Sequence, residues 1–520
     1  MPDTRENGRR SVLWALLTGA VLVGVLLATI HFRRVLRAAH DPGFSVAPAH
    51  ATIPIGSRDG ARPIVSADGE FITLEPGGKF LINSITKKPV FITGDSAWSL
   101  LTQLDNADVE LYLSDRASRR FNYIWCAAAD NYYQSNAPKN YYGNPPFDGP
   151  DFTNEDAHYW EHVDDVIRRA EAHGITVALA PAFVGLNSSV GYLASYQSSS
   201  DSVVAAYGEF LGDRYKSYPN IIWAIGGDVD PNTGVVPKLN VLATAIRSKD
   251  SVHLIVAEGE PQHAASDTFA GTTWMDLNWL YFHTTNVPGG AASNYSRLPW
   301  LPPFQGEGWY ENDHSMTQLQ LREQGYWAVL SGAYLGNGGF GNDPLWYFNG
   351  GPEAKPGEPG WRDQLASPGS MSQMALGKLF RSREHWKLVP DLNHVVVTAG
   401  YDSRGSFSSA WEFVHSTVHR ESYRLGGASS IAARTSDGQT IVAYVPNGNA
   451  ATITIDMSKI TDSGSRAKCW WFNPRDGSST LIGTYATSGS RKFTPPDGND
   501  WALTLDSAAA NLPAPGGADR

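Results

Sequence analysis

Residues 221–228 read IIWAIGGD, five apolar residues followed by two glycines and an acid. This composition predicts a short buried strand that ends at a polar position. A second apolar run, ITVALAP at residues 175–181, lies earlier in the chain, and a helical pattern separates the two runs. The apolar residues of that helical pattern are Val204, Tyr207, Leu211 and Tyr215. A strand, a helix and another strand in this order predict two parallel strands of one sheet.

The same alternation of strands and helices continues on both sides of this unit. Helical spacing recurs in residues 106–120 and in residues 160–170, where Gly174 follows as a C-terminal cap. Further strands are predicted at residues 91–95, 121–127, 254–257, 280–282, 300–305 and 332–335. About eight such units in roughly 300 residues predict an α/β fold, a (β/α)8 TIM barrel. No GxGxxG motif opens a helix after the first strand, which argues against a dinucleotide-binding sheet.

The character of the sequence changes after Trp386, where the helical patterns stop. Short alternating runs such as TIVAYV at residues 440–445 follow, separated by Gly, Asn and Asp, and this pattern is typical of a β-sandwich. We therefore assign residues 63–390 to a barrel domain and residues 391–507 to a C-terminal all-β sandwich. Residues 508–520 are rich in Pro, Gly and Ala and are predicted to form a disordered tail.

The N-terminal region contains a candidate membrane anchor. Residues 12–32 (VLWALLTGAVLVGVLLATIHF) carry no formal charge and are long enough to span a bilayer as a helix. The run exceeds the apolar region of a signal peptide and ends in HFRR without a small-residue cleavage site, which favours an uncleaved anchor. Arginines flank both ends, so the charge bias does not decide the orientation. We predict a flank and transmembrane helix over residues 1–38 and a linker over residues 39–62.

The overall composition disfavours several classes of function. The formal net charge of -11 argues against a nucleic-acid partner, because phosphate binding requires concentrated Lys and Arg. Cys126 and Cys469 lack the spacing of zinc ligands and are predicted to be free thiols. HExxH and GxSxG motifs are absent, which disfavours a zinc peptidase and an α/β-hydrolase. We expect no metal, no cofactor and a monomer.

In a TIM barrel the active site lies at the C-terminal ends of the strands. The polar residues that follow the apolar runs are, in chain order, Asp95, Asp130, Asp228, Glu258 with Glu260, His283, Glu307 and Asn337. This ring is acidic, and the chain also contains 17 Trp, 22 Tyr and 20 Phe, whose flat rings suit the faces of sugars. The combination predicts a site that binds carbohydrate.

Two carboxyl groups that face each other across a pocket are the usual requirement for glycoside hydrolysis. One is protonated and donates to the leaving oxygen, and the other is ionised and attacks the sugar or activates water. Asp228 and Glu307 are the predicted pair because each follows a buried strand through glycine, Gly227 and Gly306 respectively. Glycine lets the backbone approach the substrate and leaves the acid uncovered. Either acid taken alone could equally be a capping or ion-paired carboxylate.

These stretches carry a resemblance to a known family. Over about residues 68–386 the chain resembles the apiosidase-like glycoside hydrolases, long catalogued as a domain of unknown function. The matching stretches are FITGDSAWSLL, FNYIW, NIIWAIGGD, PFQGEGWYE, GAYLGNGGFGNDPLWYF and LFRSREHWKLVPD. Over about residues 391–506 the chain resembles the module often found behind that domain, labelled "putative collagen-binding domain", through AYVPNG, WWFNPRDG and PPDGNDWAL.

The resemblance implies a retaining β-glycosidase with its acid/base at the end of strand 4 and its nucleophile at the end of strand 7. Matched to this chain, Asp228 becomes the acid/base and Glu307 the nucleophile. Tyr310 would hydrogen-bond the nucleophile. The other substrate-binding candidates are Asp95, Trp98, His283, Asn337, Trp346 and Glu260.

Several of these assignments have structural alternatives. Asp95 could cap the following helix, and Tyr310, His283 and Trp346 could belong to the core. Glu258 and Glu260 compete for the role of a substrate-binding acid.

The chain departs from the usual pattern at two strand ends. Gly227 occupies the position where related barrels often carry an Asn that contacts the sugar 2-hydroxyl. The sixth strand ends in YFHTT at residues 281–285, where the family usually has a Gln-Ser-Gly-His-like run. The predicted function is therefore hydrolysis of a glycosidic bond in a cell-wall or extracellular polysaccharide side chain, without a named sugar. Such a substrate requires a membrane-anchored barrel outside the cytoplasm, in the periplasm or at the cell surface.

A non-catalytic carbohydrate-binding or adhesion protein is the alternative from another class. The presence of both Asp228 and Glu307 disfavours it. A collagenolytic peptidase is suggested only by the label of the C-terminal module, and the chain has neither a zinc motif nor a nucleophile triad.

Overall fold

The computed structural model of the 520-residue chain describes residues 72–401, 430–446 and 452–519. The predicted anchor at residues 12–32 and the predicted linker at residues 39–62 lie outside the described residues. Among the helices that are described, none combines the length and the apolar character needed to cross a membrane.

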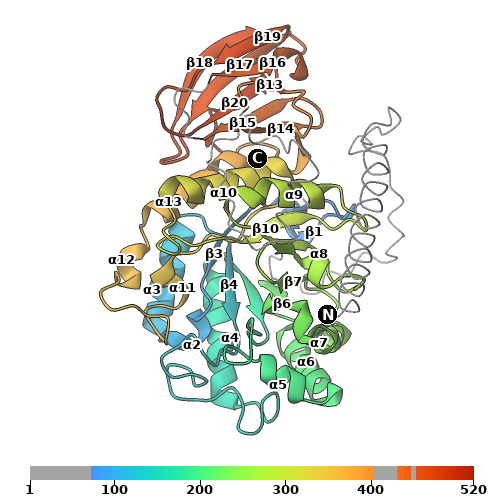
Figure 1. Cartoon of the computed structure of the whole chain (residues 1–520), viewed down its shortest axis with the longest axis vertical. Coiled ribbons are helices and arrows are strands. Elements are labelled where there is room, and N and C mark those ends of the chain that lie inside the picture. Colours follow the sequence, from blue (N-terminus) through green and yellow to red (C-terminus); the bar gives the residue numbers. More distant parts are fainter. Residues whose placement is uncertain (1–71, 402–429, 447–451, 520) are drawn as a thin grey trace, which may run out of the picture. The chain divides into compact units, whose positions relative to one another are not determined.

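A nine-stranded sheet curls into a nearly closed barrel whose strands are surrounded by helices (Figure 1). Its strand order is β7-β6-β5-β4-β3-β11-β10-β9-β8, and only the short β8 pairs in the antiparallel direction. The eight parallel strands are β3 (Ile92–Ser96), β4 (Tyr123–Ala127), β5 (Thr176–Ala180), β6 (Ile221–Val229), β7 (Ile255–Gly259), β9 (Asn278–Tyr281), β10 (Pro303–Glu307) and β11 (Gly336–Asn337). These strands confirm the predicted TIM barrel.

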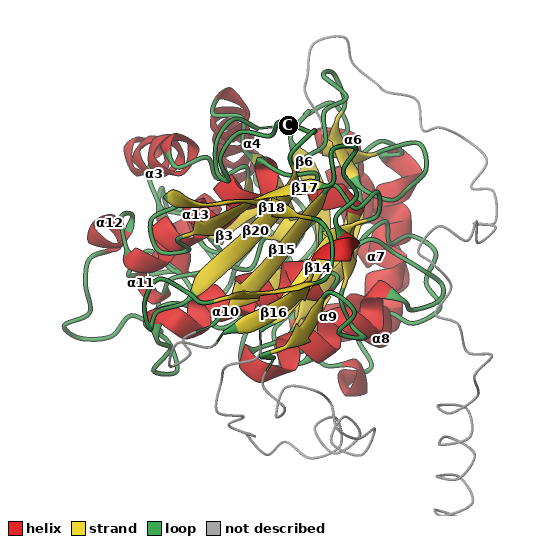
Figure 2. Cartoon of the chain, turned by 90° about the horizontal axis from the view of Figure 1, so that it is seen from above, coloured by secondary structure: helices red, strands yellow, loops and turns green. Residues whose placement is uncertain are grey.

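Helices follow the strands and cover the outside of the barrel (Figures 1 and 2). The longer ones are α3 (Asn106–Ser118), α4 (Ala157–Ala172), α6 (Asp201–Tyr215), α7 (Val236–Lys249), α9 (Val287–Tyr295), α10 (Gln318–Ser331) and α13 (Pro368–Arg381). The shorter ones are α2 (Leu100–Gln103), α5 (Leu193–Ser198), α8 (Ala265–Thr268), α11 (Asp343–Trp346) and α12 (Trp361–Gln364).

Helix α4 shows why the local sequence forms these elements. The Asp156 side chain accepts a hydrogen bond from the Tyr159 amide and so caps the first turn. The predicted apolar face, which includes Trp160 and Ile167, is fully buried. Gly174 follows the helix with φ of 68°, a left-handed conformation that glycine adopts without a steric penalty. The helix therefore begins, packs and ends as its sequence predicts.

The last barrel strand lies later in the chain than its apolar pattern indicates. Residues 332–335, predicted as a strand, form the turn that leads from α10 into β11. Gly332 has φ of 136°, and Leu335 is fully buried. Apolar residues are needed in this turn because it lies against the core, so its composition resembles that of a buried strand.

Within the described residues, two short strands precede the barrel and nine strands follow it. Strands β1 (Ile72–Leu74) and β2 (Leu81–Asn83) form an antiparallel hairpin. One C-terminal sheet has the order β12-β14-β15-β20-β17-β18 and the other has the order β13-β16-β19. Their bounds are β12 (Leu388–Pro390), β13 (Val397–Ala399), β14 (Ile431–Thr435), β15 (Thr440–Val445), β16 (Ile453–Asp456), β17 (Arg466–Phe472), β18 (Ser479–Ala486), β19 (Ser490–Phe493) and β20 (Trp501–Ser507).

The two C-terminal sheets enclose a second hydrophobic core. Ile455 of the three-stranded sheet lies in one cluster with Ile441, Cys469 and Leu505 of the six-stranded sheet. Strands β14, β15 and β20 of the larger sheet lie side by side in Figure 2. Two antiparallel sheets around a shared core are consistent with the predicted sandwich. Strand β12 lies within the range predicted for the barrel domain, but it pairs with β14 of the sandwich.

The opposite face of the larger sheet packs on helices of the barrel. The ring of Tyr444 stacks on that of Tyr326 in α10 at a centroid distance of 4.6 Å. The Arg322 guanidinium donates two hydrogen bonds to the Asp500 carboxylate, at 2.7 and 2.8 Å. Arg383 pairs with Asp506 at 2.7 Å, and both side chains are almost completely buried. Barrel and sandwich therefore share buried apolar and charged contacts.

The C-terminal residues differ from the predicted disordered tail. Residues 508–519 are described, and Leu512 within them is only 7% exposed. The Gly516 amide donates to Ser382 Oγ at 2.8 Å, and Arg383 donates to the Pro513 carbonyl at 3.0 Å. The Pro, Gly and Ala content offers little apolar area of its own. Order comes instead from one buried leucine and from backbone bonds to the residues that follow α13.

Candidate active site

Asp228 lies in a distorted part of β6. The pairing of β6 with β7 shifts between Gly226 and Val229, which marks a β-bulge. Gly226, Gly227 and Asp228 have φ of 115°, 107° and 53°. A left-handed conformation in a non-glycine residue is uncommon and is often found at functional sites. The two glycines allow the bulge, which lies at the C-terminal end of β6 and brings Asp228 close to Glu307.

Gly227 leaves no room for the side chain that related barrels often carry there. A Cβ atom built on Gly227 would lie 2.4 Å from Cδ2 of Phe183. The Phe183 ring therefore occupies the space that an Asn side chain would fill. Where this sequence has glycine instead of Asn, an aromatic ring fills that part of the site wall.

Glu307 ends β10, where close backbone packing fixes its position. The register of β10 against β9 shifts between Gln305 and Glu307. A Cβ atom on Gly306 would lie 2.2 Å from the Trp279 ring, and one on Gly339 would lie 2.5 Å from the Glu307 Cα. Glycine is required at both positions because any side chain would displace the strand that carries Glu307.

A chain of hydrogen bonds reaches Glu307 from Trp98, which lies just after β3. The Tyr310 hydroxyl donates to Glu307 Oε1 at 2.6 Å, and Trp98 Nε1 donates to the Tyr310 oxygen at 2.9 Å. The Tyr310 segment is anchored by Glu311, which accepts a hydrogen bond from the Gly369 amide at 2.9 Å. Trp98, Tyr310 and Glu307, all predicted site residues, are thus brought together. Charge-assisted bonds of this kind stabilise the ionised form of a carboxyl group.

A third carboxyl group, Glu258, lies beside this pair. It ends β7 and is fully buried. Its Oε2 accepts a hydrogen bond from Trp125 Nε1 at 3.0 Å. The Trp125 ring stacks on Trp98 at a centroid distance of 4.7 Å. We call Asp228, Glu258 and Glu307 the carboxyl cluster.

The carboxyl cluster has no cationic partner among the described residues. Burial and the charge of Glu307 raise the pKa of Asp228 to about 8. Burial and the same charge raise the pKa of Glu258 well above its usual value. Burial also raises the pKa of Glu307, but the neighbouring Glu258 and the hydrogen bond from Tyr310 oppose this rise. The environment therefore favours protonated Asp228 and ionised Glu307.

Aromatic rings form a wall beside the cluster. The Trp98 ring meets Phe183 edge-on at 4.6 Å and Trp346 at 6.0 Å. Tyr133 contacts Trp346 at 4.8 Å and Phe183 at 5.2 Å. Trp346, predicted as a stacking platform, is partly exposed, while Trp98 is 4% exposed. Of the two predicted tryptophans, Trp346 is the more exposed and is therefore the better candidate for contact with a sugar ring.

Asp95 does not join the cluster. Its Oδ2 accepts hydrogen bonds from the Tyr112 hydroxyl at 2.8 Å and from Arg116 Nη1 at 3.1 Å, both in α3. Successive side chains of a strand point to opposite faces. Asp95 therefore faces the helix layer, whereas Ser96 lies on the other face of β3. It does not cap the following helix α2, because the N-cap of α2 is Ser99.

The remaining predicted residues lie at the edge of the site or outside it. His283 is 7% exposed, and burial lowers its pKa to about 3, so it is neutral. Asn337 donates to Gln373 Oε1 at 3.1 Å and accepts from the Gly339 amide, so its polar atoms hold the loop that contacts Glu307. Glu260 is partly exposed, with His263 3.6 Å away.

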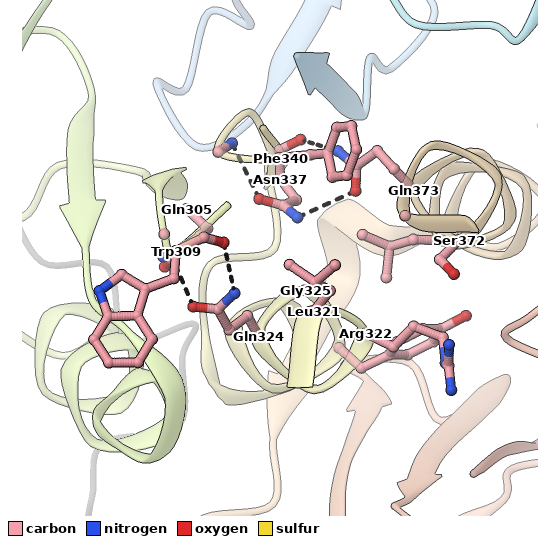
Figure 3. Close-up of a pocket in the computed structure, with 15 residues that line it drawn as sticks. Gln305, Trp309, Leu321, Arg322, Gln324, Gly325, Asn337, Phe340, Ser372 and Gln373 are labelled. Carbon is pink, nitrogen blue, oxygen red and sulfur yellow. Dashed lines mark hydrogen bonds between the residues drawn. The ribbon is translucent and has the colours of Figure 1, made fainter. Parts of the chain in front are cut away.

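A separate small cavity lies between the strands β10 and β11 and the helices α10 and α13 (Figure 3). Its lining includes Gln305, Gln324, Asn337 and Gln373, with Asn337 bonded to Gln373. The volume of about 20 Å³ suits a single water molecule. No member of the carboxyl cluster lines it. We interpret it as a packing defect of the barrel wall.

Two contributors were not recognised from the sequence. Phe183 follows β5 and was not singled out, and Tyr281 was noted only as part of the strand-6 ending. The charges of Asp228 and Glu307 raise the pKa of the Tyr281 hydroxyl after burial, which indicates that all three groups are close. Their positions after barrel strands were the available signal.

In the described part of the chain, no group of three or more His, Cys, Asp or Glu side chains could hold a metal ion.

Two family models match the chain. The model described as "Apiosidase-like, catalytic domain" matches residues 75–387. The model described as "Putative collagen-binding domain of a collagenase" matches residues 418–506. The carboxyl cluster and the aromatic wall lie within the first match. No curated protein matches the chain.

Solved structures show the same fold. One described as "Glycoside hydrolase" is 22% identical, with a TM-score of 0.68 and coverage of 85% of this chain and 97% of its own. A glycoside hydrolase family 5 protein from Bacteroides vulgatus is 22% identical, with a TM-score of 0.67 and coverage of 85% and 93%. These similarities extend over both the barrel and the sandwich.

Proposed function

The chain belongs to the apiosidase-like family of glycoside hydrolases, and on this premise we propose that it is a retaining β-glycosidase. Asp228 is the acid/base and Glu307 is the nucleophile. The observation that carries the proposal is the difference between their environments. Asp228 has its pKa raised to about 8, while Glu307 accepts a 2.6 Å hydrogen bond from Tyr310. Glycosidases separate the pKa values of their two carboxyls in this way.

In the first step, Asp228 donates its proton to the glycosidic oxygen as the bond to the anomeric carbon breaks. Glu307 attacks that carbon and forms a glycosyl ester. The leaving group departs as a neutral alcohol, and Asp228 becomes a carboxylate. Protonation of Asp228 at neutral pH is supported by its raised pKa.

In the second step, the Asp228 carboxylate removes a proton from water, and the resulting hydroxyl attacks the anomeric carbon. Glu307 leaves as a carboxylate, and Asp228 is protonated again. The hydroxyl of Tyr310 donates to Glu307 and so stabilises its charge when it is released. Two displacements at one carbon retain its configuration.

The proposed substrate is a neutral sugar in a cell-wall or extracellular polysaccharide side chain. The carboxyl cluster has no cationic partner in the described residues, so an anionic sugar would be repelled. Trp346 offers a partly exposed ring for stacking. Because such a substrate lies outside the cytoplasm, we propose that residues 12–32 anchor the barrel there.

The test uses the full chain purified in mild detergent. Wild type, Asp228→Asn and Glu307→Gln are screened on aryl β-glycosides and on plant and bacterial polysaccharides, and NMR follows the anomeric configuration of the first product. The matched control is Asp213→Asn, since Asp213 is an exposed carboxylate of α6. We expect hydrolysis with retention, lost in the two cluster variants alone. Inversion, or full activity in both variants, would contradict the proposal. Binding without hydrolysis by wild type would support the non-catalytic alternative.

A further inference from the structure

Asp228 Oδ1, Glu258 Oε1 and Glu307 Oε2 are buried oxygens of the carboxyl cluster, and none of the three has a hydrogen-bond partner in the described residues. Glu258 and Glu307 each shift the pKa of the other, which indicates that these two groups lie close together. The other oxygen of each group is occupied, by Trp125 at 3.0 Å and by Tyr310 at 2.6 Å. A buried oxygen without a donor is costly, and two such oxygens on adjacent ionised groups would also repel each other.

A single proton between the two groups removes both costs. We propose that Glu258 is a positioning residue that stays protonated and donates a hydrogen bond to Glu307, so that the pair carries one negative charge. This inference rests on the proposed role of Glu307 as nucleophile. It assigns the proton to Glu258 because Glu307 already accepts from the Tyr310 hydroxyl, which favours its ionised form.

The groups that surround Glu258 provide no alternative compensation for its charge. Trp125 is a neutral donor in β4, and the nearby hydroxyls are those of Tyr123 in the same strand, of Tyr281 at the end of β9 and of Tyr310 after β10. Asp228 in β6 adds a further carboxyl group. The direction in which burial and Glu307 move the pKa of Glu258 agrees with a retained proton.

Two stacked indole rings link Glu258 to Tyr310, the two residues that lie on either side of the Glu307 carboxyl group. Trp125 donates to Glu258 and stacks on Trp98, and Trp98 donates to Tyr310. The two donors to Glu307 are therefore held by one pair of stacked indoles. Neutral donors on both oxygens favour the carboxylate form, so Glu307 stays ionised at lower pH and leaves more readily in the second step.

The test compares Glu258→Gln, which keeps a donor at this position, with Glu258→Leu, which removes it. Glu161→Gln is the matched control, because Glu161 is an exposed carboxylate of α4. All variants are made in the full chain. The first readout is the pH profile of kcat/KM on the glycoside that wild type hydrolyses. The second is the midpoint of thermal unfolding between pH 4 and pH 8, which needs no substrate.

We expect the acidic limb of the profile to move upward by about one pH unit in Glu258→Leu and to stay within about half a unit of wild type in Glu258→Gln. A residue with only a structural role would lower activity in both variants without moving this limb. An equal shift in both variants, or no shift in Glu258→Leu, overturns the proposal.

The difference in unfolding midpoint between variant and wild type should change with pH in one predicted direction. A folded-state pKa above the ordinary value of 4.5 means that ionisation favours the unfolded chain as pH rises above that value. We therefore expect Glu258→Gln to gain in midpoint over wild type as pH rises from 4 to 8, while Glu161→Gln does not. A difference that is independent of pH overturns the retained proton. If wild type hydrolyses no glycoside, the proposed function fails, and this readout still decides where the proton resides.

Discussion

Carboxylates that are buried or only partly exposed occur in two regions of this protein, and the regions differ in whether a cation lies beside them. In the barrel mouth, Asp228, Glu258 and Glu307 lie together without a cation among the described residues. Between barrel and sandwich, Asp500 and Asp506 each accept from a buried or nearly buried arginine, Arg322 and Arg383 respectively. Burial raises the pKa of Asp506 as well as those of Asp228 and Glu258, but Arg383 opposes the rise at Asp506, whereas no cation among the described residues does so in the carboxyl cluster. The arrangement between barrel and sandwich neutralises charge and joins two parts of the fold.

The comparison shows how to separate a chemical carboxylate from a structural one. An ion pair favours the ionised form and so opposes the rise in pKa that burial causes. A buried carboxylate without a cation is unstable as an ion and retains its proton to higher pH. Asp95, although it follows a barrel strand as Asp228 does, belongs with the structural group because Arg116 lies 3.1 Å from it.

The largest expected effect concerns the carboxyl cluster. Glu307→Gln should lower kcat/KM by about 10⁴-fold or more, because it removes the nucleophile. The free energy of unfolding should not fall, since the variant removes an uncompensated buried charge. Steady-state kinetics and thermal unfolding measured on the same preparation test both statements. A loss of activity accompanied by unfolding would indicate a structural role instead.

At the interface between barrel and sandwich, loss of one charged partner should lower stability rather than activity. Arg383→Met leaves Asp506 buried without its cation and should lower the free energy of unfolding by about 3–5 kcal/mol. Urea unfolding provides the measurement. The double variant Arg383→Met with Asp506→Leu is the control and should recover much of the loss, because it removes the orphaned charge as well. A single variant as stable as wild type would contradict the structural role of this pair.

A variant of Asp95 distinguishes a structural role of this residue from its predicted role in substrate binding. Asp95→Asn should lower the free energy of unfolding by about 1–3 kcal/mol, because Arg116 keeps Asp115 as a second partner. KM should be unchanged, since Asp95 faces α3. Trp346→Ala is the comparison variant and should raise KM while stability is retained. A raised KM in Asp95→Asn would return this residue to the substrate site.

A smaller effect is expected in the dependence of kcat/KM on pH. With the pKa of Asp228 at about 8, kcat/KM should fall about tenfold per pH unit above that value, because the acid loses its proton. On an aryl glycoside with an activated leaving group, Asp228→Asn should lose this alkaline limb. A wild-type profile that stays flat to pH 10 would exclude Asp228 as the acid.

Much of the fold could be predicted from local patterns. The apolar run at residues 221–225 lies in β6, and Gly174 ends α4 as expected. Tyr310 and Glu307 are three residues apart, so their contact was within reach of the sequence. The tail at residues 508–519 was misjudged because Leu512 is buried by residues distant in the chain.

The sequence alone determined the order of strands and helices, the positions of acids after strands, and the glycines that permit the bulge at Asp228. These features depend on periodicity and backbone freedom, which act over a few residues. Only the tertiary structure decided which of these carboxyl groups lie beside a cationic side chain. Arg116 is 21 residues from Asp95 and Arg383 is 123 residues from Asp506. Whether a buried carboxylate is neutralised depends on such distant partners, because charge interactions depend on distance in space rather than separation along the chain.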